Sequence, residues 1–163
     1  MKKSYKAAYS GILLALSAGI SAAESLIPLP LGVKPGFSNI PVMFAMSELS
    51  VSISFSICLL KSVFVIFTRG TTAFFMSLSG GLLAFAVMLI IYKKISASFI
   101  VISIIGSLAH NIGQIIAACF IIGSTVIVYL PMLIISGCIA GTSTGLVIKL
   151  ILPILKPFLR RNQ

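Results

Sequence analysis

The chain has 163 residues, of which 59% are hydrophobic and 9% charged, and its formal net charge is +10. Soluble globular domains carry about 25% charged residues, so this composition excludes an ordinary soluble domain. The basic residues gather at the chain ends and at the Lys93-Lys94 pair, which is the pattern of a membrane-topology signal and not of a nucleic-acid-binding surface. Apolar runs of about 20 residues recur, and runs of this length can cross a bilayer as helices. The sequence predicts one all-α integral membrane domain over residues 1–163.

The apolar pattern predicts a bundle of about six transmembrane helices. In chain order they cover about 6–27, 37–48, 51–68, 72–92, 97–122 and 126–152. Gly70, the Lys93-Lys94 pair and Gly123-Ser124 separate the later helices. The first apolar run could instead be a secretory signal peptide, with a cleavage site at Ser21-Ala22-Ala23. A regular spacing of small residues favours a retained helix.

That spacing runs along the whole of the first helix. Small residues recur at every fourth position and have further small neighbours, namely Ala7, Gly11, Ala15, Gly19 and Ala23, with Ala18 and Ala22 beside them. Such a stripe lets a second helix approach closely. The stripe could pack inside the bundle or dock a partner subunit, and the residues alone leave both alternatives open.

The segment "SLIPLPLGVKPGFSNIP", residues 25–41, cannot be one helix because it contains four prolines. The helix that follows, over 37–48, rises only about 18 Å, which is too short to cross the bilayer. We therefore expect residues 28–36 to dip into the membrane from outside. Short or broken helices of this kind point to binding sites in transporters. The alternative is a plain surface loop above a tilted helix.

The basic residues also predict the topology. With the N-terminus inside, the cytoplasmic side carries Lys2, Lys3, Lys6, Lys93, Lys94, Lys156, Arg160 and Arg161, whereas the outer side carries Lys34 and Arg69. Both termini are then cytoplasmic, and the number of crossings is even.

Polar side chains inside the apolar runs are the candidate functional residues. Lys61 lies near the middle of a predicted helix, where a charge costs about 2.5–3.5 kcal/mol. We expect Glu24 to be its counter-ion, because Glu48 lies too far along the helix axis. Helix 97–122 carries Ser103, Ser107, His110, Asn111 and Gln114 on one face. This face either forms hydrogen bonds between helices or lines a substrate cavity.

Several kinds of chemistry are not expected. The chain has no aspartate, so the carboxylate cluster that holds magnesium in diphosphate-handling synthases cannot be assembled. A single histidine and three cysteines without a CxxC spacing, Cys58, Cys119 and Cys138, predict neither a metal site nor a disulfide framework. We expect no catalytic residue, no metal and no bound cofactor.

Four blocks of sequence resemble one family. "ESLIPLPLGVKPGFSNI", "FFMSLSGGLLAF", "GSLAHNIGQIIAA" and "YLPMLIISGCIAG" resemble the Gx transporter family, also called heptaprenyl diphosphate synthase component I. Pro35 departs from the family pattern, which more often has an aliphatic residue there. The family is similar to the S components of energy-coupling factor (ECF) transporters. Those are six-helix bundles in bacterial cell membranes that capture a vitamin-like solute beneath outer loops.

The resemblance implies roles for particular residues. S components dock on a transmembrane coupling protein and two ATPases through small residues of the first helix, which correspond here to Ala15, Ala18, Gly19 and Ala22. The implied ligand region contains Lys34, Asn39, Lys61, Arg69, His110, Asn111 and Gln114. Its cations favour an anionic solute.

Two functions therefore remain open. In the first, the chain is the substrate-binding subunit of an ATP-driven uptake system for a small anionic solute. In the second, it is a non-catalytic accessory subunit for prenyl diphosphate or quinone metabolism, or for flavin- or quinone-linked electron transfer. A prenyl synthase or a redox protein would then be its partner.

Overall fold

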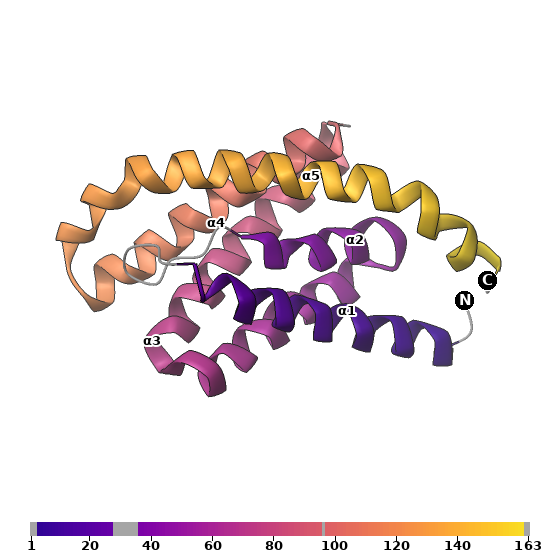
Figure 1. The fold of residues 1–163 in the computed structure, drawn as a ribbon, viewed down its shortest axis with the longest axis horizontal. Coiled ribbons are helices and arrows are strands. Elements are labelled where there is room, and N and C mark those ends of the chain that lie inside the picture. The colour runs from indigo at the N-terminus through magenta and orange to yellow at the C-terminus, as the bar shows by residue number, and fades with distance from the viewer. Residues whose placement is uncertain (1–2, 28–35, 96, 162–163) are drawn as a thin grey trace.

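The computed structural model describes residues 3–27, 36–95 and 97–161, and within them it contains helices and no strand. The helices are α1 (Lys3–Glu24), α2 (Ile40–Glu48), α3 (Val51–Lys94), α4 (Phe99–Ile121) and α5 (Leu130–Arg161), with short 3-10 helices η2 (Phe37–Asn39) and η3 (Ser124–Tyr129). Figure 1 shows that they lie side by side in one bundle. The predicted all-α class is confirmed.

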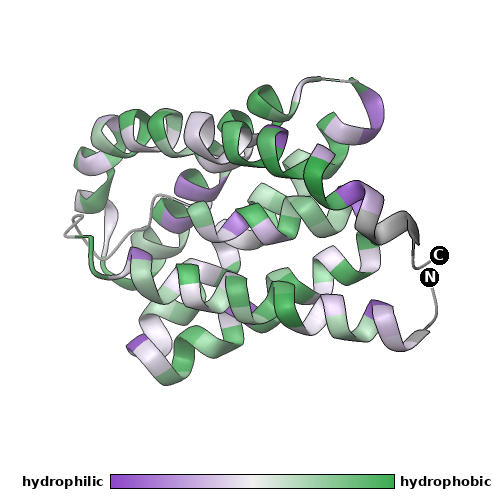
Figure 2. Ribbon diagram, turned by 45° about the vertical axis from the view of Figure 1, so that its right-hand side comes forward, coloured by the Kyte–Doolittle hydropathy of each residue, from purple (hydrophilic) through white to green (hydrophobic). Residues whose placement is uncertain are grey.

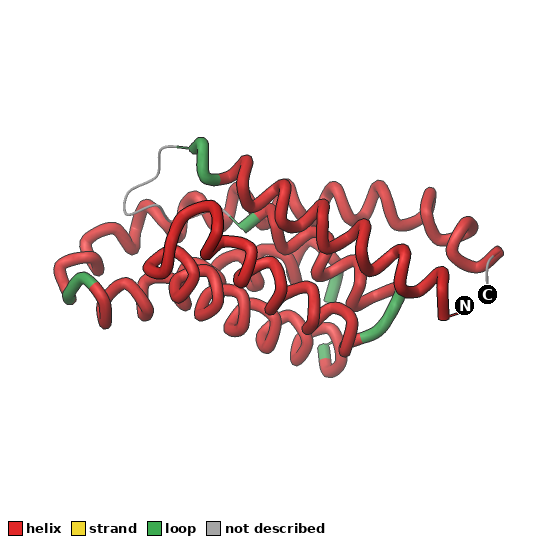
Figure 3. The backbone as a smooth tube through the Cα atoms, turned by 90° about the horizontal axis from the view of Figure 1, so that it is seen from below, coloured by secondary structure: helices red, strands yellow, loops and turns green. Residues whose placement is uncertain are grey.

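The long helix α3 folds back on itself at Gly70. This glycine has a φ of 84° and a ψ of −177°. Only glycine adopts this conformation without a steric penalty. The two arms, residues 51–69 and 71–94, then run antiparallel: the Ser62 and Ser77 hydroxyls are 3.3 Å apart, and a Cβ on Gly81 would lie 3.1 Å from Cys58 Sγ. The helix break that the sequence predicted at Gly70 is present, and the turn is visible in Figures 1 and 3.

The short helix α2 lies at the centre of the bundle. Residues 41–46 are all buried, and they pack against α3, α1 and α5. The apolar core around them includes Leu13, Ile57, Met88 and Ile148. The Ser54 hydroxyl ties α2 to α3 by donating a 2.6 Å hydrogen bond to the Val42 carbonyl. Together η2 and α2 coincide with the helix predicted over 37–48.

Glycines bring α4 and α5 into close contact. A Cβ on Gly141 would stand 2.5 Å from Ile104 Cα, and one on Gly145 would stand 2.5 Å from Ile100 Cα. With Gly137 they form a repeated GxxxG spacing, which lets helix backbones approach within a membrane. The predicted end of the last helix at 152 is wrong, because α5 continues through Pro153 and Pro157 to Arg161. Proline is tolerated in helices of membrane proteins, where neighbouring groups satisfy the freed carbonyls.

The outer surface of the bundle is apolar. In the described part of the chain, four helices are long and apolar enough to cross a membrane: α1, α3, α4 and the η3–α5 stretch. Large side chains such as Phe67, Phe120 and Val128 are almost fully exposed, and Figure 2 shows hydrophobic residues along the outer helices. The chain is a membrane protein.

The two ends of the bundle differ. The beginning of α1 and the end of α5 lie at the same end of the molecule (Figures 1 and 3). There the Lys156 ammonium lies 3.6 Å from the Glu48 carboxylate. The first arm of α3 rises from this end to Gly70 over about 28 Å. We refer to these ends as the Glu48 end and the Gly70 end.

Candidate functional site

A set of buried polar side chains lies beyond the N-terminal end of the short helix α2. The set consists of Glu24, Ser38, Asn39, Lys61, His110 and Gln114, each between 1% and 4% exposed. We call it the polar cluster. Its members come from α1, η2, α3 and α4. Four elements that are distant in sequence therefore converge on one buried place.

Lys61 is the charged centre of the polar cluster. Its Nζ donates to Asn39 Oδ1 at 2.5 Å and to Ser38 Oγ at 3.4 Å. The side chain is 1% exposed, and no described carboxylate forms an ion pair with it. Buried ammonium groups are normally paired with an anion, so neutral oxygens alone leave this charge incompletely compensated.

Glu24 attracts Lys61 as the expected counter-ion, but among the described residues the two side chains form no direct ion pair. Glu24 Oε1 instead accepts hydrogen bonds from the backbone N–H groups of Gly36, at 2.6 Å, and Phe37, at 2.5 Å. The sequence argument considered only side-chain charges, and these backbone donors appear only once the chain is folded. Attraction by the Glu24 charge still reaches Lys61, and it also reaches the partly buried Arg69.

The segment from Gly36 to Asn39 lies deep inside the bundle. Asn39 contacts Lys61, which stands about 15 Å along α3 from Val51. A Cβ on Gly36 would lie 3.7 Å from both His110 and Ser107, and His110 is the central residue of α4. The Ser17 hydroxyl of α1 anchors the segment further by donating to the Ser38 carbonyl at 2.7 Å. Non-helical backbone this deep in the bundle is tolerated because other groups of the protein form hydrogen bonds with it.

The predicted inward fold concerned residues 28–36. Gly36 is inside the bundle, as its contacts with α4 show. Residues 28–35, and with them the predicted site residue Lys34, lie outside the described residues.

The polar side chains of α4 face two different helices, α3 and α5. His110 Nε2 and Gln114 Nε2 are 2.9 Å apart and lie against Gly80, where a Cβ would stand 2.7 Å from the His110 carbonyl oxygen. Asn111, by contrast, faces α5 and donates from Nδ2 to the Leu133 carbonyl at 2.7 Å. His110 and Gln114 therefore belong to the polar cluster, whereas the predicted site residue Asn111 joins α4 to α5.

The predicted docking residues lie on or beside an open face of α1. Ala15 and Gly19 are exposed, Ala22 is half-buried and Ala18 is buried. A Cβ added to Gly19 would meet no atom within 4 Å. The stripe Ala7, Gly11, Ala15, Gly19 and Ala23 is exposed along its whole length. It is not used for packing within the described chain.

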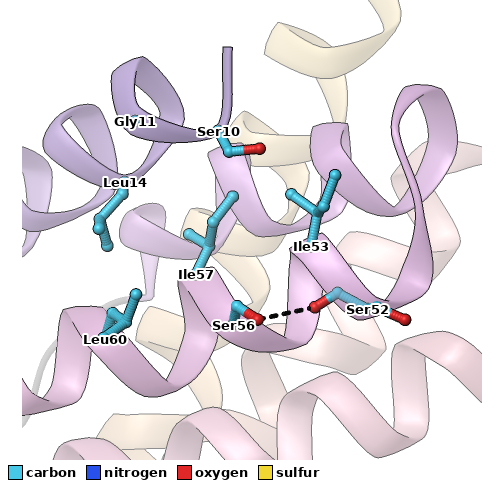
Figure 4. Close-up of a pocket in the computed structure, with 8 residues that line it drawn as sticks. All are labelled: Ser10, Gly11, Leu14, Ser52, Ile53, Ser56, Ile57 and Leu60. Atoms are coloured by element: carbon cyan, nitrogen blue, oxygen red, sulfur yellow. Dashed lines mark hydrogen bonds between the residues drawn. The ribbon is translucent and has the colours of Figure 1, made fainter. Parts of the chain in front are cut away.

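Apolar grooves run between this stripe and the first arm of α3. One has a volume of about 330 Å³ and is shown in Figure 4, with Gly11 and Leu14 on one wall and Ile57 and Leu60 on the other. A second, of about 370 Å³, continues past Ala15 and Ala18 toward Phe67. Both grooves share Gly11, Leu14 and Leu60.

The described side chains do not bring together three or more His, Cys, Asp or Glu residues in a way that could hold a metal ion. All three cysteines are free thiols. The expectation of a non-catalytic chain without metal or cofactor stays a prediction.

Three features of the site were not predicted. The Gly80-Gly81 pair lets α3 approach α4 and the Lys61 side chain, and Gly137, Gly141 and Gly145 seat α5 on α4. Small residues at intervals of four in "SGCIAGTSTG" were a visible signal for the second feature. No sequence pattern indicated the roles of Ser17 and Ser38, because single serines are common in membrane helices.

Comparison with known proteins agrees with the sequence blocks described above. No curated protein sequence and no solved structure matches the chain. The family model described as heptaprenyl diphosphate synthase component I matches residues 13–151, which include α2, α3 and α4 entirely and every member of the polar cluster. The chain belongs to the heptaprenyl diphosphate synthase component I family.

Proposed function

We propose that this protein is the substrate-binding subunit of an ATP-driven uptake system, similar to an ECF S component, and that it captures a small anionic solute of vitamin or cofactor type. The observation that carries the proposal is Lys61. It is buried at mid-height of the bundle, and within the described residues its ammonium group donates to the neutral oxygens of Asn39 and Ser38. An ionisable residue inside a membrane bundle marks a substrate or ion pathway by default.

The surroundings of Lys61 support an organic anion as the ligand. His110 and Gln114 place ring and amide nitrogens in the polar cluster, where they contact each other, and Arg69 adds a second cation at the Gly70 end. Hydrogen-bonding groups around a desolvated cation suit a carboxylate or phosphate better than a neutral solute. In this structure the polar cluster is closed, since its members are at most 4% exposed. Solute entry therefore requires the helices around the polar cluster to open.

The fold supports a coupled system of several subunits. The chain has no nucleotide-binding motif of the GxxxxGK type, so ATP hydrolysis belongs to partner ATPases. The exposed small-residue stripe of α1 and its flanking apolar grooves suit close helix–helix contact with a transmembrane coupling protein.

We further propose a bacterial cell-membrane location with about six crossings and both termini in the cytoplasm. The fold-back at Gly70 supports counting α3 as two crossings, and η2 with the short α2 counts as one. The shared end of the N-terminal and C-terminal helices supports an even number (Figure 1).

The name of the family supports a second candidate. Its description refers to a component of heptaprenyl diphosphate synthase, so the chain could be a non-catalytic membrane subunit that holds a prenyl synthase or a quinone- or flavin-linked redox partner. The absence of aspartate from the sequence argues against a catalytic role for the chain itself.

Affinity purification from native membranes separates the two candidates. For an uptake subunit we expect ATPases and a transmembrane coupling protein to co-purify in stoichiometric amounts. Recovery of a prenyl synthase, or of a flavoprotein or quinone-reducing partner, in place of the ATPases would contradict the uptake function and establish the accessory one.

A further inference from the structure

The backbone just before α2 forms a site for an anion. Gly36 has a left-handed conformation, φ 102 and ψ 14, and the next residue begins η2. This alternation turns successive N–H groups toward one point, a backbone nest that binds anionic oxygen. Glu24 Oε1 sits at that point and accepts from the Gly36 and Phe37 N–H groups at 2.6 and 2.5 Å. The nest is occupied by a carboxylate of the protein itself.

The hydrogen bonding around this carboxylate is incomplete. In the described part of the chain, neither Glu24 Oε2 nor Asn39 Nδ2 has a hydrogen-bond partner, and both residues are more than nine-tenths buried. Asn39 Nδ2 lies 3.6 Å from the place where a Cβ on Gly36 would stand, so this unused donor faces the nest residue. A buried donor without an acceptor is unfavourable. The site therefore contains one buried donor, Asn39 Nδ2, to which Glu24 supplies no acceptor oxygen.

The charge balance also favours a further anion. The sequence has two acidic side chains, and Glu48 is at the opposite end, paired with Lys156. Glu24 is thus the carboxylate side chain whose attraction reaches both Lys61 and Arg69. Two cations share one internal anion.

We infer that the nest receives the acidic group of the transported solute, and that Glu24 occupies it as an internal substitute while no solute is bound. The inference rests on the proposed function and assigns the solute a phosphate or carboxylate group. That group accepts from the Gly36 and Phe37 amides, takes the free Asn39 donor and faces Lys61. Glu24 is the last residue of α1, so its side chain can leave the nest without unwinding the helix.

The test is a calorimetric titration of the full chain in lipid nanodiscs with inorganic phosphate, and separately with acetate. Glu24→Gln removes the competing charge, so we expect it to bind at least one of the two anions about tenfold or more tightly than the unaltered protein. Glu48→Gln, the matched control at the other end, is expected to keep the affinity of the unaltered protein. In the Glu24→Gln protein the amide NMR signal of Gly36 should shift as the anion is added.

A second variant guards against a folding defect. Glu24→Asp keeps the charge on a side chain one methylene shorter, which weakens the internal contact, and it is expected to change the affinity in the same direction. Folded Glu24→Gln and Glu24→Asp proteins that bind phosphate and acetate no more tightly than the unaltered protein would overturn the inference. That result leaves the proposed function standing, because the partners and the solute that co-purify with the unaltered protein test it separately.

Discussion

At the scale of single residues, the site depends on how a buried ammonium group is stabilised. Lys61 donates to Asn39 and Ser38, and these oxygens are in turn fixed because Ser17 and Glu24 of α1 hold the same short segment. Each contact is a hydrogen bond within the protein, so Lys61 and the chain from Gly36 to Asn39 stabilise one another. Removing either partner leaves a buried polar group unmatched.

Replacing Lys61 by methionine should separate binding from folding. The change keeps most of the side-chain volume but leaves Asn39 Oδ1 without its donor, so we expect a loss of about 1–3 kcal/mol in stability. Anion binding should be abolished. Thermal unfolding in detergent and titration with a candidate anionic solute measure the two effects. Lys93→Met, at an exposed position, serves as the control, and a Lys61→Met protein that binds and takes up solute normally would exclude a role for this lysine.

Gly36 should not tolerate a side chain. Its φ of 102 costs about 1–2 kcal/mol for an L-residue, although ordinary contact distances of 3.6–3.7 Å leave space for a methyl group. Gly36→Ala should therefore lower the free energy of unfolding through the backbone alone. Gly11→Ala is the matched control, since that position is helical and open, and it should be neutral or slightly stabilising. Equal stability of the two variants would show that the nest conformation is not maintained.

At the scale of elements, glycines decide which helices touch. The α4–α5 contact depends on Gly141 and Gly145, whose missing side chains allow backbone contact with Ile104 and Ile100. The α1 stripe has the same spacing but meets nothing within the described chain at Gly11 and Gly19. The same sequence pattern therefore has two outcomes, one internal and one open to a partner.

A larger side chain at the α4–α5 contact should destabilise the protein. A Cβ at Gly141 would stand 2.5 Å from a backbone atom that cannot move aside, so Gly141→Ala forces α5 away from α4. Overpacking of this kind typically costs about 1–3 kcal/mol. We expect a lower unfolding temperature in detergent for Gly141→Ala than for Gly19→Ala. A Gly141→Ala protein as stable as the original would contradict the observed helix contact.

Larger side chains in the exposed α1 stripe should leave the stability of the protein unchanged but prevent its assembly with partner subunits. We expect the double variant Ala15→Leu, Gly19→Leu to fold normally, because both positions are exposed, yet to lose the ATPases and coupling protein on purification. Ala86→Leu, at an exposed alanine of α3, is the control and should retain the partners. Retention of the partners by the double variant would rule out this surface as the docking site.

At the scale of the whole molecule, the short α2 divides the interior in two. Its buried residues fill the Glu48 half with an apolar core, and the polar cluster occupies the level where α2 begins. Because α2 is too short to cross the bilayer, other residues must fill the interior beyond its N-terminal end. Here the space is shared between a second apolar cluster, which includes Met76 and Ile115, and the polar cluster with the charged Lys61. The polar cluster is the physical basis of the proposed solute site.

Sequence patterns predicted the helices more accurately than the contacts between them. Helix positions, the break at Gly70 and the short helix that ends at Glu48 followed from apolar runs, glycine and proline, which act locally. The extension of α5 past residue 152 did not. The Glu24 contact could not be foreseen, since its partners are backbone N–H groups brought near by folding. Asn111 shared a helical face with His110, but a helix face is broad enough to meet two neighbours, and Asn111 meets α5.

The most direct test of the central claim, that the polar cluster is a solute site, is native mass spectrometry of protein released from its own membranes. We predict a bound small anion in the unaltered protein, unchanged in Lys93→Met and missing from folded Lys61→Met. A bound compound that is neutral, or an anion that Lys61→Met retains in full, would contradict the claim.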